Sequence, residues 1–290
     1  LNDSVYAKVL SKARAGDYSA IMIAFPCSTF SIARFFDAST SSKDRGPPPV
    51  RTRAHPDGLP ADQLDPRYER ELRVSNQLLD RVVEIAIAAY ESSSTATIVL
   101  ENPADRTTRG SPEFISDEIA DKHGSIFATK QYKRLSSAVS LKTATFAACS
   151  FGHPSQKYTT IAFTADASEV LDPLNEPSHK CKHQKGEHEK AGGRSSDGSG
   201  FVSSEHAAYS DEFNVRLAMA FTFARTGSVK PASMLPAKSA PAAGLEAAKT
   251  VKFADVVNDA AVPPPTAATA ALPRAPTTPA GDERAGVSPI

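Results

Sequence analysis

Two short apolar runs, each ended by a motif that contains proline, limit the folds open to this chain. The first is Ile21–Ala24, which leads through Phe25 into Pro26-Cys27; the second is Thr97–Leu100, which leads into Glu101-Asn102-Pro103. Runs this short and rich in β-branched residues predict buried strands more than helices. Ligands of α/β proteins bind at the carboxyl ends of such strands. We therefore predict an α/β fold with Cys27 and Glu101 at one edge of its sheet.

Cys27 and Glu101 are a chemically useful pair. A thiolate can add to an electron-poor ring, and a buried carboxyl with a raised pKa can donate a proton to that ring in the same step. Each residue also has a purely structural interpretation. A single cysteine after an apolar run is often a small buried hydrophobe, and a glutamate after a strand often belongs to the capping region of the next helix.

Pro-Cys after one strand and Glu-Asn after another resemble the DNA (cytosine-5) methyltransferases. Pro103, where the family usually has valine, resembles a divergent branch found in phages and in eukaryotic mobile elements. The resemblance implies a doubly wound, Rossmann-like sheet, S-adenosyl-L-methionine as methyl donor and DNA as partner. It also implies that Cys27 attacks C6 of a flipped-out cytosine while Glu101 holds the base edge near N3 and protonates the ring. The residues that it assigns to substrate binding are Pro26, Ser31, Asn102 and Lys157.

Lys157 enters this set through a third match. Two β-prone runs, residues 144–149 and 158–164, flank a polar segment and predict a hairpin. The family carries a Gly-x-Pro-Gln-x-Arg-x-Arg hairpin, and Gly152, Pro154, Gln156 and Lys157 match part of it. Lysine supplies the charge of the family's arginine without its planar fork.

The glycine-rich cofactor turn of the family has no counterpart here. That turn follows the first strand and lies well before the Pro-Cys motif, whereas Gly16 is the only glycine before Gly46 in this chain. Close approach of backbone to a ligand requires such glycines. We therefore expect a methyltransferase-like sheet that is incomplete at its N-terminus and whose cofactor-binding residues are unknown.

Four helices are expected around these strands. Residues 69–90 have the clearest period, with Leu72, Leu79 and Val83 on one face, and their position between two strands predicts a crossover helix. Shorter helices are predicted at residues 3–15, 112–122 and 209–225.

Composition divides the chain into a domain, residues 1–225, and a Pro/Ala-rich tail, residues 226–290, which we expect to be disordered. Within the domain, residues 37–65 are rich in proline, glycine and serine and predict a loop insert. Its basic residues, together with Arg34 just before it, either contact DNA phosphates or are ordinary charges of a solvated loop. They are Arg34, Arg45, Arg51, Arg53 and His55.

A second polar cluster follows the hairpin and contains His179, Cys181, His183, Glu187 and His188. Imidazoles and a thiol at this spacing could bind Zn²⁺. A lysine-rich loop without a second cysteine pair is more often solvated, so the sequence favours no metal.

Composition limits the partners and the compartment. Lys plus Arg equals Asp plus Glu at 33 each, so any surface that binds nucleic acid must be local. Three widely spaced cysteines predict free thiols in a reducing compartment. No apolar run reaches the length of a membrane span, and we expect a soluble, intracellular protein, with the nucleus as a candidate compartment. The oligomeric state stays open.

The sequence therefore predicts a DNA cytosine C5 methyltransferase-like domain, with three alternatives. The first is a catalytically inactive nucleic-acid-binding relic of a mobile-element protein, which the missing glycine turn favours. The second is a Cys-His hydrolase that uses Cys27, a histidine and Asn102. The third is an amino-methyltransferase, whose Asp-Pro-Pro-Tyr or Asn-Pro-Pro-Tyr motif is not in the sequence.

Overall fold

The computed structural model describes residues 2–35, 47–93, 95–184, 187–189 and 208–227. The chain divides into two units, Leu1–Thr250 and Val251–Ile290, and every described residue belongs to the first. Almost all of the expected tail, and residues 37–46 of the expected insert, lie outside the described residues.

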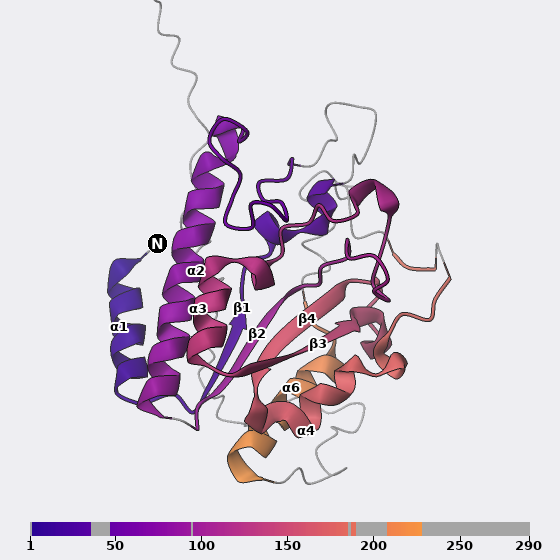
Figure 1. Cartoon of the computed structure of the whole chain (residues 1–290). Helices are drawn as coiled ribbons and strands as arrows, with labels where there is room; N and C mark the ends of the chain where they lie inside the picture. Colours follow the sequence, from indigo (N-terminus) through magenta and orange to yellow (C-terminus); the bar gives the residue numbers. More distant parts are fainter. Residues whose placement is uncertain (1, 36–46, 94, 185–186, 190–207, 228–290) are drawn as a thin grey trace, which may run out of the picture. The chain divides into compact units, whose positions relative to one another are not determined.

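The described strands form one four-stranded mixed sheet in the order β1-β2-β4-β3 (Figure 1). They are β1 (Ala20–Ala24), β2 (Thr97–Pro103), β3 (Leu141–Ala147) and β4 (Tyr158–Thr164). Strands β1 and β2 are parallel, whereas β4 is antiparallel to both β2 and β3. The predicted α/β class, the two parallel strands and the β3-β4 hairpin are confirmed.

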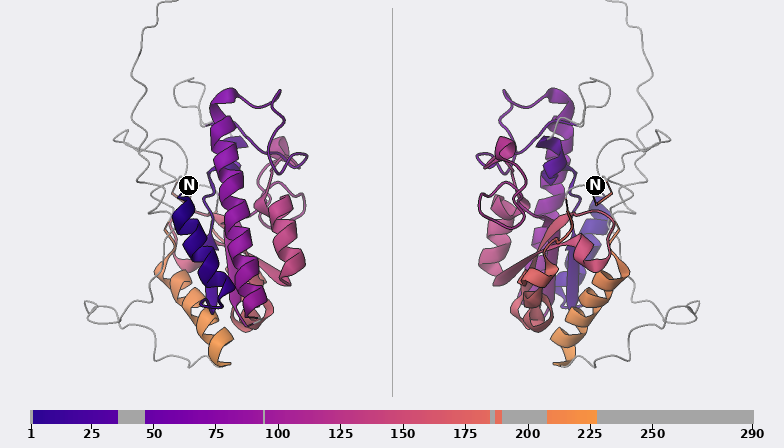
Figure 2. Two further views of the ribbon diagram at one scale, coloured as in Figure 1. Left: turned by 90° about the vertical axis from the view of Figure 1, so that its left-hand side faces the viewer. Right: turned by 90° about the vertical axis from the view of Figure 1, so that its right-hand side faces the viewer.

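Helices cover both faces of the sheet (Figures 1 and 2). The α-helices are α1 (Asp3–Arg14), α2 (Pro66–Ser92), α3 (Lys130–Ala138), α4 (Ser168–Leu171) and α6 (Asp211–Thr226). Ile98 and Leu100 of β2 belong to a buried cluster with residues of α2 and α3, whereas Val99 belongs to a second cluster with residues of α4 and α6. This alternation follows from the two-residue period of a strand. Both faces of β2 are therefore buried, which explains why its sequence is apolar without interruption.

Short 3₁₀ turns connect these elements. They are η1 (Ser28–Phe30), η2 (Ile32–Phe35), η3 (Asp117–Ile119), η4 (Ile126–Ala128), η5 (Ala148–Phe151), η6 (Ala165–Ala167), η7 (Asp172–Asn175) and η8 (Pro177–His179). Two of these turns position cysteines: η1 comes directly after Cys27, and η5 contains Cys149.

Local capping explains where the helices begin. The Asp65 side chain accepts a hydrogen bond from the backbone N–H of Arg67, and Pro66 occupies the first turn, so α2 begins three residues before the predicted start. Asn2 rather than Asp3 caps α1, which packs against α2 through a bond from Ser92 Oγ to the Ala13 carbonyl oxygen. Among the described residues, no helix has the length and apolar character needed to cross a membrane.

The helix predicted at residues 112–122 is wrong, since only the 3₁₀ turn η3 forms there. Backbone donors of the segment bond to a neighbouring loop instead of to their own preceding turn. The N–H of Ile115 donates to the Arg106 carbonyl, and the N–H of Asp121 donates to the Thr107 carbonyl. Asp121 also has a φ of 57°, outside the helical region. Helix α3 was missed because its sequence is short and largely polar, with buried side chains only at Gln131 and Leu135.

Candidate active site at the ends of the parallel strands

Register and alternation place Glu101 and Asn102 on opposite faces of the sheet. Glu101 pairs with Ala24 of β1, and it lies on the same face as Val99, toward α6. Asn102 lies on the other face, with Ile98 and Leu100. The two polar residues that end the apolar run therefore contact different parts of the protein. Glu101 faces the start of α6, and Asn102 faces the connection that leaves β1.

Asn102 contacts that connection directly. Its side chain is fully buried, and Nδ2 donates a 3.3 Å hydrogen bond to the backbone carbonyl oxygen of Phe25. Its Oδ1 is buried without a hydrogen-bond partner among the described residues. Because Phe25 stands two residues before Cys27, this bond fixes the backbone from which the cysteine projects.

The turn after Cys27 is held by two further contacts, one local and one long-range. Nε of Arg34 donates to the Ser28 carbonyl oxygen at 2.6 Å. The Nε2 of buried His123 lies 2.7 Å from the Phe30 carbonyl oxygen. Together with the Asn102 contact, these side chains satisfy three backbone carbonyls of residues 25–30, so the turn has little freedom to move.

Arg51 holds the same turn from a third direction. Its side chain is 1 % exposed, its guanidinium lies 4.1 Å from the centre of the Phe30 ring, and it donates to Thr29 Oγ1 at 3.2 Å. The other acceptors are Pro56 O, Ser75 Oγ and Asn76 Oδ1. Burial lowers the pKa of Arg51 to about 10. Because Phe30, Thr29 and α2 enclose it, Arg51 takes neither of the two roles that the sequence left open, a phosphate contact or the charge of a solvated loop.

The other basic residues named with the loop insert differ in their surroundings. The Arg34 side chain is buried and forms an ion pair with Glu71, so it too is not a surface phosphate contact. Arg53 is partly exposed and pairs with Asp105 and Asp121. Arg45 lies outside the described residues. The Asn76 side chain of α2 accepts from Arg51 and donates to the Asp57 carbonyl.

Cys27 leaves the end of β1 and begins η1, where its carbonyl oxygen accepts from the N–H of Phe30 at 2.9 Å. The residue is exposed and its thiol is free. Partial burial of the sulfur raises the thiol pKa above its ordinary value; the charge of Lys157 lowers that pKa, and the charge of Glu101 raises it. Cys27 and Glu101 are therefore close enough to influence each other, as expected for one edge of the sheet.

Glu101 is 5 % exposed, and its two carboxyl oxygens have different surroundings. Oε2 accepts a 2.8 Å hydrogen bond from the hydroxyl of Tyr209. Oε1 is buried and has no hydrogen-bond partner among the described residues. Burial raises the pKa of this carboxyl, while the Lys157 charge and the hydroxyls of Tyr209 and Thr159 lower it. Burial is the largest effect, so the protonated form of Glu101 is favoured relative to a carboxyl in water.

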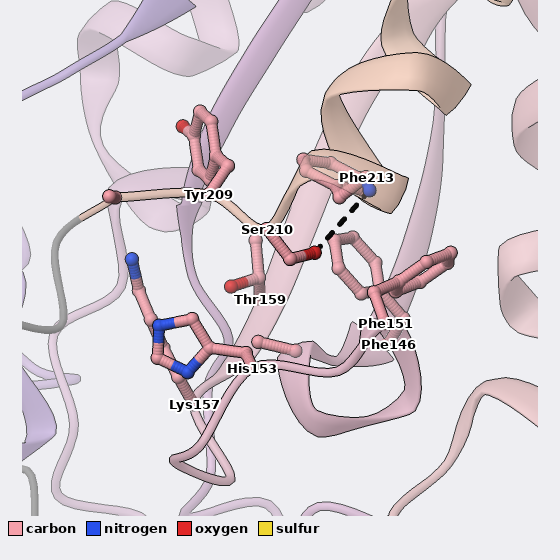
Figure 3. Close-up of a pocket in the computed structure, with 10 residues that line it drawn as sticks. Phe146, Phe151, His153, Lys157, Thr159, Tyr209, Ser210 and Phe213 are labelled. Carbon is pink, nitrogen blue, oxygen red and sulfur yellow. Dashed lines mark hydrogen bonds between the residues drawn. The ribbon is translucent and has the colours of Figure 1, made fainter. Parts of the chain in front are cut away.

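Tyr209 is the site residue that the sequence did not indicate. It stands two residues before α6, in the segment that Ser210 caps by accepting from the N–H of Phe213. Its side chain lies beside that of Lys157, whose Nζ is 5.7 Å from the ring centre (Figure 3). Burial and the neighbouring Glu101 raise the pKa of Tyr209, so the hydroxyl stays protonated and donates. No motif marks this tyrosine, because its partner lies 108 residues earlier.

The remaining predicted site residues are Pro26, Ser31 and Lys157. Pro26 is exposed beside Cys27. Ser31 is half-buried at the end of η1, and its hydroxyl accepts a 3.3 Å bond from the N–H of Ala33, which is a local turn contact. The charge of Lys157 acts on both the Cys27 thiol and the Glu101 carboxyl. The structure thus brings Lys157 to the cysteine and glutamate, whereas the described contact of Ser31 is with its own turn.

A small pocket shares some of its lining residues with this site (Figure 3). Lys157, Thr159 and Tyr209 belong to both the pocket and the site, whereas Cys27 and Glu101 do not line it. The rest of the wall is mainly aromatic, with two alanines and two polar residues: Phe146, Phe151, Phe213, Ala148, Ala208, His153 and Ser210. The pocket therefore extends the site toward an aromatic surface, next to the lysine.

Comparison of the chain with models of protein families, with curated proteins and with solved structures gave no significant match. The function is therefore inferred from the site itself.

Proposed function

We propose that the chain binds a pyrimidine base of DNA and adds Cys27 to its ring, as in cytosine C5 methyltransferases. In this proposal Cys27 is the nucleophile, Glu101 is the acid that protonates the ring, and Asn102 holds the connection that carries the cysteine. Lys157 supplies the positive charge of the site, and Pro26 and Ser31 border the base. The α/β domain is proposed to be of the doubly wound methyltransferase type, in an intracellular protein that acts on DNA.

One observation carries the proposal: a buried carboxyl, with one oxygen that has no partner among the described residues, pairs in register with the end of the strand that leads to the exposed Cys27. Glu101 has a raised pKa, and its Oε1 has no partner among the described residues. An unsatisfied buried oxygen costs about 1–3 kcal/mol, which a ligand that pairs with it would recover. A protonated carboxyl donates one hydrogen bond, and N3 of cytosine is an acceptor. The carboxyl is thus suited to the ring nitrogen of the base that the cysteine would attack.

The proposed addition is balanced in atoms and electrons. The thiol of Cys27 loses its proton to solvent, and the sulfur electron pair forms a bond to C6 of the ring. The electrons of the C5–C6 double bond move toward N3, which takes the proton of Glu101. Lys157 favours the thiolate through its charge, and protonation of the ring prevents build-up of negative charge there.

The described residues do not form a cradle for S-adenosylmethionine. Gly16 is the only glycine in the stretch before Cys27, and it lies at the end of α1, beside Ser92, away from the strand ends. A glycine turn that admits a nucleotide-like ligand is therefore lacking from this part of the sequence. We derive no methyl-transfer step, and the proposal concerns base binding and addition to the ring.

The same observation supports a second candidate, a domain that binds a base without forming an adduct. The Cys27 pKa is raised rather than lowered, so at neutral pH the thiol is the dominant form. A base could then pair with Glu101 and remain unmodified. The two candidates differ in whether the Cys27 sulfur forms a bond.

The test is adduct formation with single-stranded DNA that contains 5-azacytosine, whose electron-poor ring accepts thiolates at C6 and a proton at N5. We expect a complex that survives denaturant, carries the mass of protein plus DNA, and disappears in Cys27→Ala. Lys142→Met is the matched control, since Lys142 pairs with Asp172 on the surface of β3, and it should form the adduct as the wild type does. Binding without any adduct would support the second candidate. An adduct that persists in Cys27→Ala would refute the proposed addition.

A further inference from the structure

Four metal-binding side chains from two parts of the chain meet next to the turn that follows β3. They are Cys149, Cys181, His183 and His188, and one ligand atom from each lies within 4.8 Å of every other. Two thiols and two imidazoles form a common ligand set for structural Zn²⁺. His179, considered with them from the sequence, is not in this group: its ring stacks on Phe151 at a centroid distance of 5.0 Å.

The sequence favoured no metal because the histidine-rich segment lacks a second cysteine pair. The structure removes that objection. Cys149 belongs to η5, directly after β3, and the fold brings it to Cys181 although 31 residues separate them in the chain. A pattern of Cys, then Cys-x-His-x₄-His matches no short motif, so the site could not be recognised before the fold was known.

Distances within the group agree with a tetrahedral ion. The Cys181 Sγ lies 3.5 Å from His188 Nε2 and 3.8 Å from His183 Nδ1. Zn–S bonds of about 2.3 Å and Zn–N bonds of about 2.0–2.1 Å, at tetrahedral angles, separate sulfur from nitrogen by about 3.6 Å. The two imidazole rings are nearly perpendicular, with centroids 4.7 Å apart, so their different nitrogens can point to one centre.

We propose that Cys149, Cys181, His183 and His188 bind one zinc ion as a closed structural site. Four protein ligands leave no open position for substrate, so the ion would stabilise structure and not catalyse a reaction. Two thiolates balance the charge of Zn²⁺, which explains how a metal could lie in a partly buried place. The ion would fasten Cys181, His183 and His188 to Cys149, directly after β3.

The hairpin is also the element that presents Lys157 to the candidate active site. The N–H of Ala148, next to Cys149, donates to the Lys157 carbonyl oxygen at 3.0 Å. The N–H of Cys181 donates to the hydroxyl of Tyr158 at 3.1 Å. Zinc would therefore support the two contacts, one to Lys157 and one to its neighbour Tyr158. Its removal should make Lys157 more mobile and leave the positions of Cys27 and Glu101 unchanged.

Metal content of the full chain tests the site. After purification under reducing conditions and dialysis against zinc, we expect about one zinc ion per chain, measured by elemental mass spectrometry. Cys149→Ser and His188→Ala should each lose that ion, whereas Cys27→Ala should retain it, because Cys27 lies in the other site. A wild-type chain without zinc, or zinc that remains in the Cys149→Ser variant, would overturn the proposal.

Two further measurements keep the test decisive if a ligand variant fails to fold. His188→Cys preserves four ligands as Cys₃His and should keep one zinc. With cobalt in place of zinc, the sulfur-to-cobalt absorption should be stronger in this variant than in the wild type, since it has an additional thiolate. An unchanged spectrum would contradict ligation by residue 188.

Discussion

The hydroxyl of Tyr209 donates a 2.8 Å hydrogen bond to Oε2 of Glu101, and so joins the start of α6 to the end of β2. This bond uses one carboxyl oxygen and leaves Oε1 without a partner among the described residues. It also fixes the orientation of the carboxyl, because the Tyr209 ring packs edge-on against the Phe213 ring, with ring centroids 5.3 Å apart. The proposed acid is thus held by a residue just before α6, in a segment that the sequence predicted only as a helix.

Replacing Tyr209 by phenylalanine should raise the pKa of Glu101 further. The Tyr209 hydroxyl lowers that pKa by stabilising the ionised carboxyl, so its loss favours the protonated form. The variant should also lose about 1–2 kcal/mol in the free energy of unfolding. Infrared titration of the carboxyl and denaturant unfolding measure the two effects.

Tyr132→Phe is the matched control, since burial is the only cause that raises the pKa of Tyr132 and the residue lies in α3, on the opposite face of the sheet. It should leave the titration of Glu101 unchanged. A Glu101 pKa that is equal in Tyr209→Phe and in the wild type would show that the hydrogen bond does not act on the carboxyl.

Glu101→Gln should make the protein more stable at neutral pH than the wild type. The folded-state pKa of Glu101 is raised, so between the ordinary value of 4.5 and the folded value the native state holds a proton that the unfolded state has lost. Stability of the wild type therefore falls as pH rises through that window, at about 1.4 kcal/mol for each pKa unit between the two values. Glutamine keeps an acceptor for Tyr209 and does not titrate.

Denaturant unfolding between pH 3.5 and 8 checks this prediction. The stability difference between Glu101→Gln and the wild type should be smallest below pH 4.5, where both states of the wild type are protonated, and should grow toward neutral pH. Gln63→Ala, a change at an exposed residue that does not titrate, should show no such growth. A difference that stays constant with pH would mean that burial does not shift the carboxyl.

The sequence predicted the parts of this structure that depend on local patterns. Strand β2 and helix α2 follow from an apolar run and a helical period, and the Pro-Cys and Glu-Asn motifs placed Cys27 and Glu101 at neighbouring strand ends. Contacts between distant segments were not predictable in the same way. Arg51 lies in a proline- and glycine-rich loop, which suggested exposure, yet Phe30 and α2 bury it. Tyr209 and Cys149 acquire their partners only through the packing of α6 and η5.

Lys157→Met should slow the alkylation of Cys27 at neutral pH. The lysine charge lowers the pKa of the thiol, so its removal leaves less thiolate and should reduce the rate by about 2- to 10-fold. Glu101→Gln should act in the opposite direction, because the carboxylate raises that pKa. At pH values above the thiol pKa of every variant, the rates should converge.

Peptide mapping after iodoacetamide treatment measures this rate for Cys27 separately from the other cysteines. Lys142→Met is the matched control, because Lys142 pairs with Asp172 on the surface of β3. It should leave the pH profile of Cys27 unchanged. Equal pH profiles for Lys157→Met and Lys142→Met would show that the Lys157 charge does not act on the Cys27 thiol.

Arg51→Met should destabilise the turn that carries Cys27, and Arg53→Met should not. Arg51 is buried, and its loss leaves Thr29 and the Pro56 carbonyl without a charged donor, which should cost about 2–4 kcal/mol in the free energy of unfolding. Arg53 pairs with Asp105 and Asp121 while partly exposed, a type of ion pair worth less than about 1 kcal/mol. Methionine keeps an unbranched apolar stem but is shorter than arginine, so it removes the guanidinium from the Phe30 ring as well as from its acceptors.

Denaturant unfolding compares the two variants, and hydrogen exchange reports on the turn itself. In Arg51→Met, the backbone N–H of Phe30, which donates to the Cys27 carbonyl, should exchange faster, whereas in Arg53→Met its exchange should match the wild type. Because the Asn102 and His123 contacts remain in both variants, loosening should be confined to η1 and should spare β2. Equal destabilisation by the two substitutions would show that burial of Arg51 does not support the cysteine.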